Sequence, residues 1–181
     1  MMITDELRNT NRAEYILHLW QIEDLLRAYG LDEERVAREL AGASGTSDKE
    51  HDEAARWYAD LCDMMRREGL AERGHTQIAR GALAELADLH ARLLASERFP
   101  AYRAAYMRVL PYIVELRSRA GGAEKPEIET CFEALYGVML LRMQKKALTP
   151  ATERAAADIA ALLHRLSDYC FKERDGQLDF D

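Results

Sequence analysis

Hydrophobic residues recur along this chain at steps of three and four, the spacing that places them on one face of an α-helix. No stretch shows the apolar–polar alternation of a half-buried strand. The first long helix is expected from near Asn11 to Gly30. Its inward stripe is expected to consist of Tyr15, Ile16, Leu19, Trp20, Ile22, Leu26 and Tyr29. The pattern therefore predicts an amphipathic helix that covers a core.

Capping residues, glycines and prolines divide the rest of the chain into further helices. We expect a short helix over residues 32–40, a flexible loop over 42–47 and a helix from Ser47 to Glu68. A further long helix is expected from about His75 to Ala95, and later ones begin at Pro100, at Pro126 and at Thr149. The acidic tail over residues 176–181 is expected to be frayed. The predicted fold is all-α, a single domain over residues 1–181. It is a bundle of about five long helices plus one short helix.

The helix that begins at Pro126 is the most apolar, and we predict that it is the most buried helix of the bundle. It contains Gly137, and a glycine in a helix interior costs about 1 kcal/mol relative to alanine. We therefore predict that another helix backbone crosses closely at Gly137. In the helix that begins at Pro100, Pro111 removes a backbone donor, so a kink is expected there.

Charge and composition narrow the functional classes. The 181 residues include 32 acidic and 25 basic residues, a formal net charge of −7, which disfavours binding to a nucleic-acid backbone. The longest apolar stretch, Ala134 to Leu141, is too short to span a membrane, and the polar N-terminal residues lack the features of a signal peptide. We therefore expect a cytoplasmic protein without nucleic-acid or membrane partners.

Three cysteines, Cys62, Cys131 and Cys170, stand in apolar helical contexts without the spacing of a zinc site. They are expected to be small core residues in a reducing compartment. Two pairs at i, i+4 suit a metal on one helix face, Glu14 with His18 and His164 with Asp168. Two ligands do not complete a site, so ordinary hydrogen bonding within the helix is favoured, and no metal or cofactor is expected.

The common phosphate-binding and hydrolase motifs are absent from the sequence, so no catalytic residue is assigned. Glu23 and Arg27 stand at i, i+4 beside the apolar stripe and are expected to form an ion pair at the edge of the core. This pair is more consistent with an architectural role than with ligand binding. Tyr102 and Tyr106 on the kinked helix, with Glu23, Arg27 and His75, are the candidate ligand-binding residues.

Five stretches of the sequence resemble a bacterial family of similar length that is known only as a domain of unknown function. The stretches are AEYILHLWQIEDLLRAYGLD (13–32), ARWYADL (55–61), GHTQ (74–77), LPYIVELRSRA (110–120) and EIETCFEALYGVMLLRMQKK (127–146). The resemblance covers nearly the whole chain and is weaker after Ala151. It implies a stand-alone, helical, cytoplasmic bacterial protein, and it brings no assigned activity, cofactor or site residue.

Two classes of function remain open. The first is a non-catalytic helical module that binds a protein partner, a second copy of itself as a homodimer, or a small ligand, because no nucleophile, base and orienting group are recognisable together. The alternative is an enzyme that acts on an anionic small molecule in a tyrosine-lined cleft.

Overall fold

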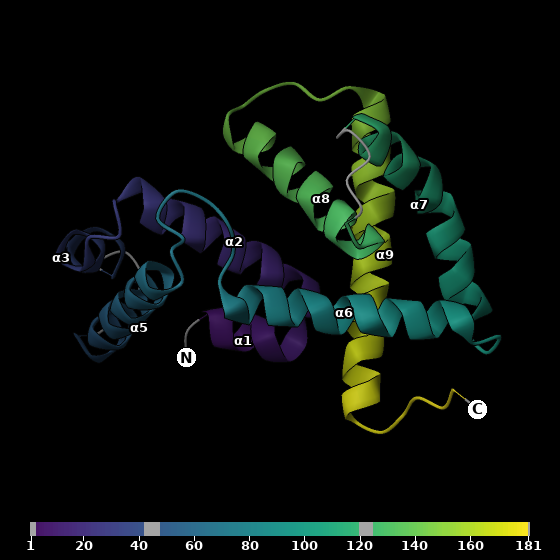
Figure 1. The fold of residues 1–181 in the computed structure, drawn as a ribbon, viewed down its shortest axis with the longest axis horizontal. Coiled ribbons are helices and arrows are strands. Elements are labelled where there is room, and N and C mark those ends of the chain that lie inside the picture. Colours follow the sequence, from purple (N-terminus) through teal and green to yellow (C-terminus); the bar gives the residue numbers. More distant parts are fainter. Residues whose placement is uncertain (1–2, 42–47, 120–124, 181) are drawn as a thin grey trace. The chain divides into compact units, whose positions relative to one another are not determined.

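The computed structural model describes residues 3–41, 48–119 and 125–180 of the chain (Figure 1). Every regular element in these residues is a helix, which confirms the all-α prediction. Six of these helices have 17 residues or more, one above the approximate count expected from the sequence. The predicted loop over residues 42–47 lies outside the described residues.

The chain divides into two compact units, which are described one at a time below. The first unit comprises residues 1–10 and 14–82, and the second comprises residues 11–13 and 83–181. The helix α6 (Gln77–Ala95) belongs to the first unit up to residue 82 and to the second from residue 83. That the chain forms one domain over its whole length stays a prediction.

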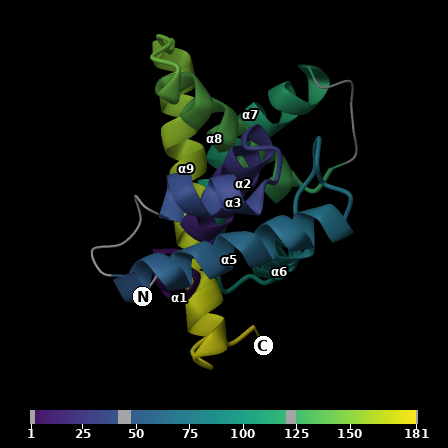
Figure 2. The same ribbon diagram turned by 90° about the vertical axis from the view of Figure 1, so that its left-hand side faces the viewer.

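The first unit is built from short and long helices. Its elements are α1 (Ile3–Thr10), α2 (Arg12–Ala28), α3 (Glu33–Val36), the π-helix η1 (Ala37–Ala41) and α5 (Asp48–Arg67). The helix α1 was not expected from the sequence. Both α3 and η1 pack against α5, and Figure 2 shows α3 beside α5. A cluster of buried residues in this unit consists of Ile22, Leu26, Leu31, Val36, Leu61, Cys62 and Met65.

The end of α2 is formed as the sequence predicts. Gly30 has a φ of +69°, and its N–H donates to the carbonyl of Arg27 at 2.8 Å. The N–H of Leu31 donates to the carbonyl of Leu26 at 2.9 Å, which completes a Schellman motif and brings Leu31 into the core. Asp32 then caps α3, because its carboxylate accepts the N–H of Arg35 at 3.1 Å.

The second unit is organised around a long C-terminal helix. The helices α7 (Pro100–Arg119) and α8 (Glu127–Met143) pack against α9 (Pro150–Arg174) and against each other (Figure 1). As predicted, Thr149 caps α9 by accepting the N–H of Thr152, and Pro150 follows at the first helical position. Pro111 lies within α7, which bends along its length in Figure 1.

The acidic tail was expected to be frayed, but its described residues contact the rest of the second unit. The ring of Phe180 lies 5.2 Å from the ring of Phe99, measured between centroids, and the guanidinium of Arg92 lies over the same ring. A carboxylate oxygen of Asp179 accepts from Arg98 at 2.6 Å. These contacts attach the described tail residues to the end of α6 and to the two residues that precede α7.

All three cysteines are free and buried, as the sequence predicts. Burial raises the pKa of the Cys62 and Cys170 thiols, and it raises that of Cys131 to about 12. These thiols therefore stay protonated near neutral pH and behave as small apolar core groups.

The prediction that the Pro126 helix is the most buried is wrong for its second half. Side chains at the start of α8 are buried, including Ile128, Cys131 and Phe132, whereas residues 134–141 are only half-buried and Met143 is 59% exposed. A Cβ atom built on Gly137 would meet no atom within 4 Å, so no backbone of the described residues crosses closely there. Despite its apolar composition, α8 is no candidate for a membrane span, and neither is any other helix among the described residues.

We therefore expect Gly137→Ala to raise the free energy of unfolding by about 0.5–1 kcal/mol, because the substitution gains helix propensity without a clash. Gly137→Leu is expected to be no less stable than the parent. Urea unfolding followed by circular dichroism measures both changes. The control is Ala156→Leu, at a buried position of α9, which should destabilise by overpacking. A destabilised Gly137→Ala variant would contradict this assignment.

Candidate functional site

Glu23 on α2 is fully buried, and its carboxylate is held by the residues that lead into α6. Its Oε1 accepts the N–H of Thr76 at 2.9 Å and the Oγ1–H of Thr76 at 2.7 Å. Its Oε2 lies 2.7 Å from Nδ1 of His75. The hydroxyl of Thr76 also accepts the N–H of Ala79, so Thr76 caps α6. The Glu23 carboxylate is thus placed at a helix N-terminus, where negative charge is stabilised.

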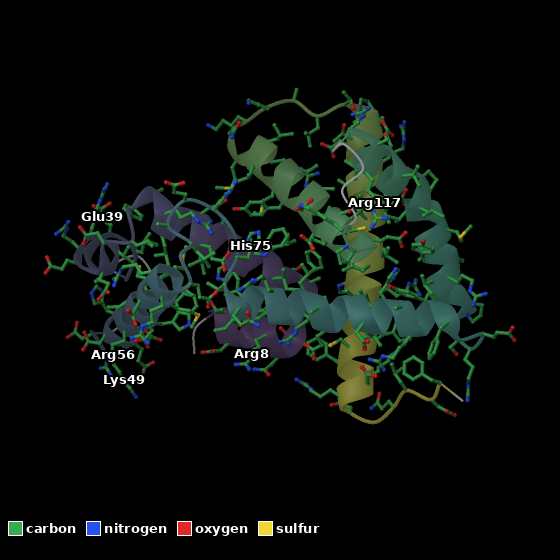
Figure 3. All side chains as sticks on the ribbon, in the orientation of Figure 1. Arg8, Glu39, Lys49, Arg56, His75 and Arg117 are labelled. Atoms are coloured by element: carbon green, nitrogen blue, oxygen red, sulfur yellow. The ribbon has the colours of Figure 1, made fainter. Side chains whose placement is uncertain are left out.

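His75 is positioned on two sides. Its ring stacks on the indole of Trp20, with centroids 4.1 Å apart and planes inclined by 12°. Because a carboxylate oxygen accepts hydrogen bonds, Nδ1 of His75 donates to Glu23 in this contact. Nε2 has no hydrogen-bond partner in the described ranges, and the His75 side chain is 34% exposed. Figure 3 labels His75 in the segment before α6.

The predicted ion pair between Glu23 and Arg27 does not form. Nε of Arg27 donates to the carbonyl of Leu70 at 3.0 Å, and Nη2 donates to the carbonyl of Gly74. Nη1 of Arg27 lies 2.6 Å from Oδ1 of Asp24. The two side chains are one helical turn apart on α2, but both form their hydrogen bonds with the loop between α5 and α6. Glu23 accepts hydrogen bonds from that loop, and Arg27 donates hydrogen bonds to it. Both charges therefore hold this loop.

A third charged side chain ties the ends of the same loop together. Oε2 of Glu68, the first residue after α5, accepts the N–H of Gln77 at 2.8 Å and lies 3.6 Å from an Nη of Arg80. Gln77 is the first residue of α6, so Glu68 satisfies one of the free N–H groups of that helix. We call residues 68–76 the clamped loop.

Tyr102 and Tyr106 belong to the second unit and take part in a different polar cluster. Tyr102 is fully buried, and its hydroxyl lies 2.7 Å from Nδ1 of His90 on α6. Nε2 of His90 lies 3.5 Å from a carboxylate oxygen of Glu127. Burial lowers the pKa of His90, and Glu127 opposes that shift. Burial, assisted by Glu127, raises the pKa of Tyr106 to about 12.

The five candidate residues thus fall into two groups. Glu23 and His75 are hydrogen-bonded to each other, and Arg27 holds the same loop, all within the first unit. The two tyrosines lie in the second unit. Sequence reasoning missed Thr76 and His90. A threonine directly before the apolar run of α6 was a usable signal for the cap at Thr76, whereas nothing local marked His90 as the partner of Tyr102.

A cavity of about 290 Å³ lies in the first unit, among α1, α2, α5 and the start of α6. Its apolar lining consists of Tyr15, Leu19, Trp57, Leu61, Met64 and Ile78. Its polar lining consists of Thr4, Asp5, Arg8, Asp60 and Thr76. Thr76 therefore takes part both in the cavity wall and in the hydrogen bonds of Glu23. The volume is at the lower end of the range of ligand pockets.

Thr4 is the unusual member of this lining. Its side chain is only 4% exposed, and Oγ1 is buried without a hydrogen-bond partner. A buried hydroxyl without a partner costs about 1–3 kcal/mol. Figure 3 labels Arg8, one helical turn further along α1.

The second unit has a hollow of about 320 Å³ along α9, lined by Ala161, His164, Arg165, Asp168, Tyr169 and Lys172. Nε2 of His164 lies 3.9 Å from Asp168, the distance of a loose contact within one helix. No group of three or more potential metal ligands occurs in the part of the chain that the structure describes. Tyr102 and Tyr106 line neither hollow.

The fold and the site define an all-α protein with a buried carboxylate at a helix N-terminus and, in the same unit, a small and mostly apolar cavity. The family model described as a domain of unknown function (DUF4924) matches residues 1–177, and the chain belongs to this family. This finding confirms the family resemblance of the sequence. No curated protein and no solved structure matches the chain.

Proposed function

We propose that this protein is a non-catalytic helical module that binds a small molecule in the cavity of the first unit. The observation that carries the proposal is the cavity of about 290 Å³, whose wall includes six apolar side chains from α2, α5 and α6. Such a wall suits the body of an organic ligand.

The separation of the basic group from the cavity supports a binding role over catalysis. The His75 ring is oriented by Glu23, but His75 is not among the residues that line the cavity. General base catalysis requires the base within hydrogen-bond reach of the reacting group. The alternative, an enzyme with a tyrosine-lined cleft, has less support because the tyrosine hydroxyl of Tyr102 is buried against His90.

Native mass spectrometry of gently purified protein tests the proposal. We expect a small molecule to accompany the parent protein and to be lost from Ile78→Trp, because Ile78 lines the cavity and, at 46% exposed, tolerates a larger side chain that fills it. The matched control is Leu25→Trp, since Leu25 is 38% exposed in the same unit and lies outside the cavity wall. Loss from both variants, or from neither, would refute binding in this cavity.

Thr4→Val provides a second measurement on the same cavity. Without ligand, this variant is expected to be about 1 kcal/mol more stable than the parent, because it removes an unsatisfied buried hydroxyl at constant shape. Retention of the co-purifying molecule should be unchanged, because the hydroxyl has no surface open to the cavity. A variant that is less stable than the parent would mean that the hydroxyl has a structural role.

A further inference from the structure

His90, on α6, lies in the interior of the second unit. The residue is 6% exposed, and its Nδ1 lies 2.7 Å from the hydroxyl of Tyr102, which is fully buried. Nε2 of His90 is also buried and has no hydrogen-bond partner among the described residues, although Oε2 of Glu127 lies 3.5 Å away. The ordinary pKa of histidine is near neutral, so His90 is a buried group whose charge can change close to neutral pH.

Other titratable or charged side chains of the second unit gather around His90. They are Tyr102, Tyr106 and Arg117 of α7, Glu127 and Cys131 of α8, and, beside Tyr102, Tyr169 of α9. Burial raises the pKa of Tyr102, and it raises that of Tyr106 and of Cys131 to about 12, so these three groups stay protonated near neutral pH. Arg117 stays charged, and its Nη1 lies 4.0 Å from Oε1 of Glu127. Among the described residues, Glu127 is the carboxylate that faces His90.

The hydrogen bond between His90 and Tyr102 depends on the protonation of the imidazole ring. The proton of the neutral ring belongs on Nε2, because it then faces the Glu127 carboxylate while Nδ1 accepts the Tyr102 O–H. A second proton, on Nδ1, removes this acceptor, so the hydrogen of the Tyr102 hydroxyl must turn away. The hydroxyl has no other hydrogen-bond partner among the described residues, and a fully buried donor without an acceptor is unfavourable. Protonation of His90 therefore weakens the link between α6 and α7 and strengthens the contact between α6 and α8.

We propose that His90 is a pH-sensitive switch in the second unit. In its neutral form, His90 accepts the Tyr102 hydroxyl and joins α6 to α7. In its charged form, it gives up that hydrogen bond for an ion pair with Glu127 at the start of α8, and α7 then opens locally from α6. None of these three residues lines the cavity of the first unit, so the switch does not depend on the proposed ligand binding.

The direction of the pH response follows from the burial of His90. Burial lowers the pKa of His90 below its ordinary value of 6.5, and Glu127 opposes that shift. In the opened form the imidazole is hydrated and recovers its ordinary pKa, so the opened form binds more protons than the closed form. Opening is therefore least favourable above pH 6.5, and it becomes more favourable as the pH falls from 6.5 towards the pKa of the closed form.

Hydrogen exchange of the full chain at about pH 7.5 and about pH 5.5, followed by mass spectrometry, measures the opening of α7. Labelling times are scaled to the intrinsic exchange rate at each pH. We expect the protection of peptides from α7 to fall about five- to tenfold at the lower pH in the parent protein, and less than about twofold in His90→Asn. Asparagine keeps an acceptor for the Tyr102 hydroxyl near the position of Nδ1 and does not titrate. The matched control is His164→Asn, because His164 is 67% exposed on α9 and its loss should leave the response intact.

The switch is overturned if the protection of α7 in the parent protein does not depend on pH, or if His90→Asn responds as the parent does. Nitrogen NMR of the His90 imidazole is a second test that needs no variant. In the parent at about pH 7.5, we expect the proton on Nε2 and none on Nδ1, and we expect His90 to titrate with a midpoint below 6.5. A proton on Nδ1 at this pH, or a midpoint at or above 6.5, would contradict the proposal.

Discussion

Glu23→Ala lowers the free energy of unfolding by about 3–5 kcal/mol, the cost of breaking a buried, hydrogen-bonded charged group. The substitution removes the acceptor of the Thr76 N–H and hydroxyl and of the His75 Nδ1–H, and it leaves space in the core. Glu23→Gln should lose less, because one amide oxygen remains as an acceptor while the amide nitrogen faces a donor. Urea unfolding at neutral pH gives both values.

The matched control for Glu23 is the neighbouring acidic residue on the same helix. Asp24→Ala should change stability by less than about 1 kcal/mol, because Asp24 is 48% exposed and contacts Arg27 at the surface. A Glu23→Ala variant as stable as Asp24→Ala would show that the carboxylate is not needed to hold the clamped loop.

Arg27→Met is the second large effect that we expect, a loss of about 2–3 kcal/mol. The side chain is only 11% exposed, and its guanidinium donates to two carbonyls of the clamped loop, so methionine keeps the packing and removes the hydrogen bonds. Arg66→Met is a suitable control, because Arg66 is 44% exposed and its ion pairs lie at the surface.

A double-mutant cycle tests whether Glu23 and Arg27 stabilise the same loop. Glu23 and Arg27 bond to different residues of the same loop. If either substitution releases the loop, the other side chain also loses part of its contribution to the free energy of unfolding. The double variant of Glu23→Ala and Arg27→Met should therefore lose about 1 kcal/mol less than the sum of the single losses. Strict additivity would mean that the two side chains stabilise separate parts of the fold.

Helix ends were predictable because their causes are local. Gly30 ends α2 through its positive φ, Asp32 caps α3, and Thr149 with Pro150 begins α9. In each case the deciding residues stand within a few positions of the bonds they make, so the sequence alone contains the information.

The partners of the candidate site residues were not predictable in the same way. Glu23 bonds to residues 52 and 53 positions away, and Arg27 to residues 43 and 47 positions away. Spacing of i, i+4 identifies side chains that are neighbours on one helix face. It does not identify partners in a loop that is distant in sequence and packs against the same helix. The prediction for Gly137 failed for a similar reason, because the apolar composition of a helix does not reveal whether another helix packs against it.

The buried thiols provide each compact unit with its own internal reporter. Cys62 belongs to the first unit, and Cys131 and Cys170 belong to the second. A protonated, enclosed thiol reacts with an alkylating reagent only when its surroundings open. The rate at which each cysteine is alkylated under native conditions therefore measures how often its own unit unfolds locally, and the three sites can be read separately in one peptide-mapping experiment.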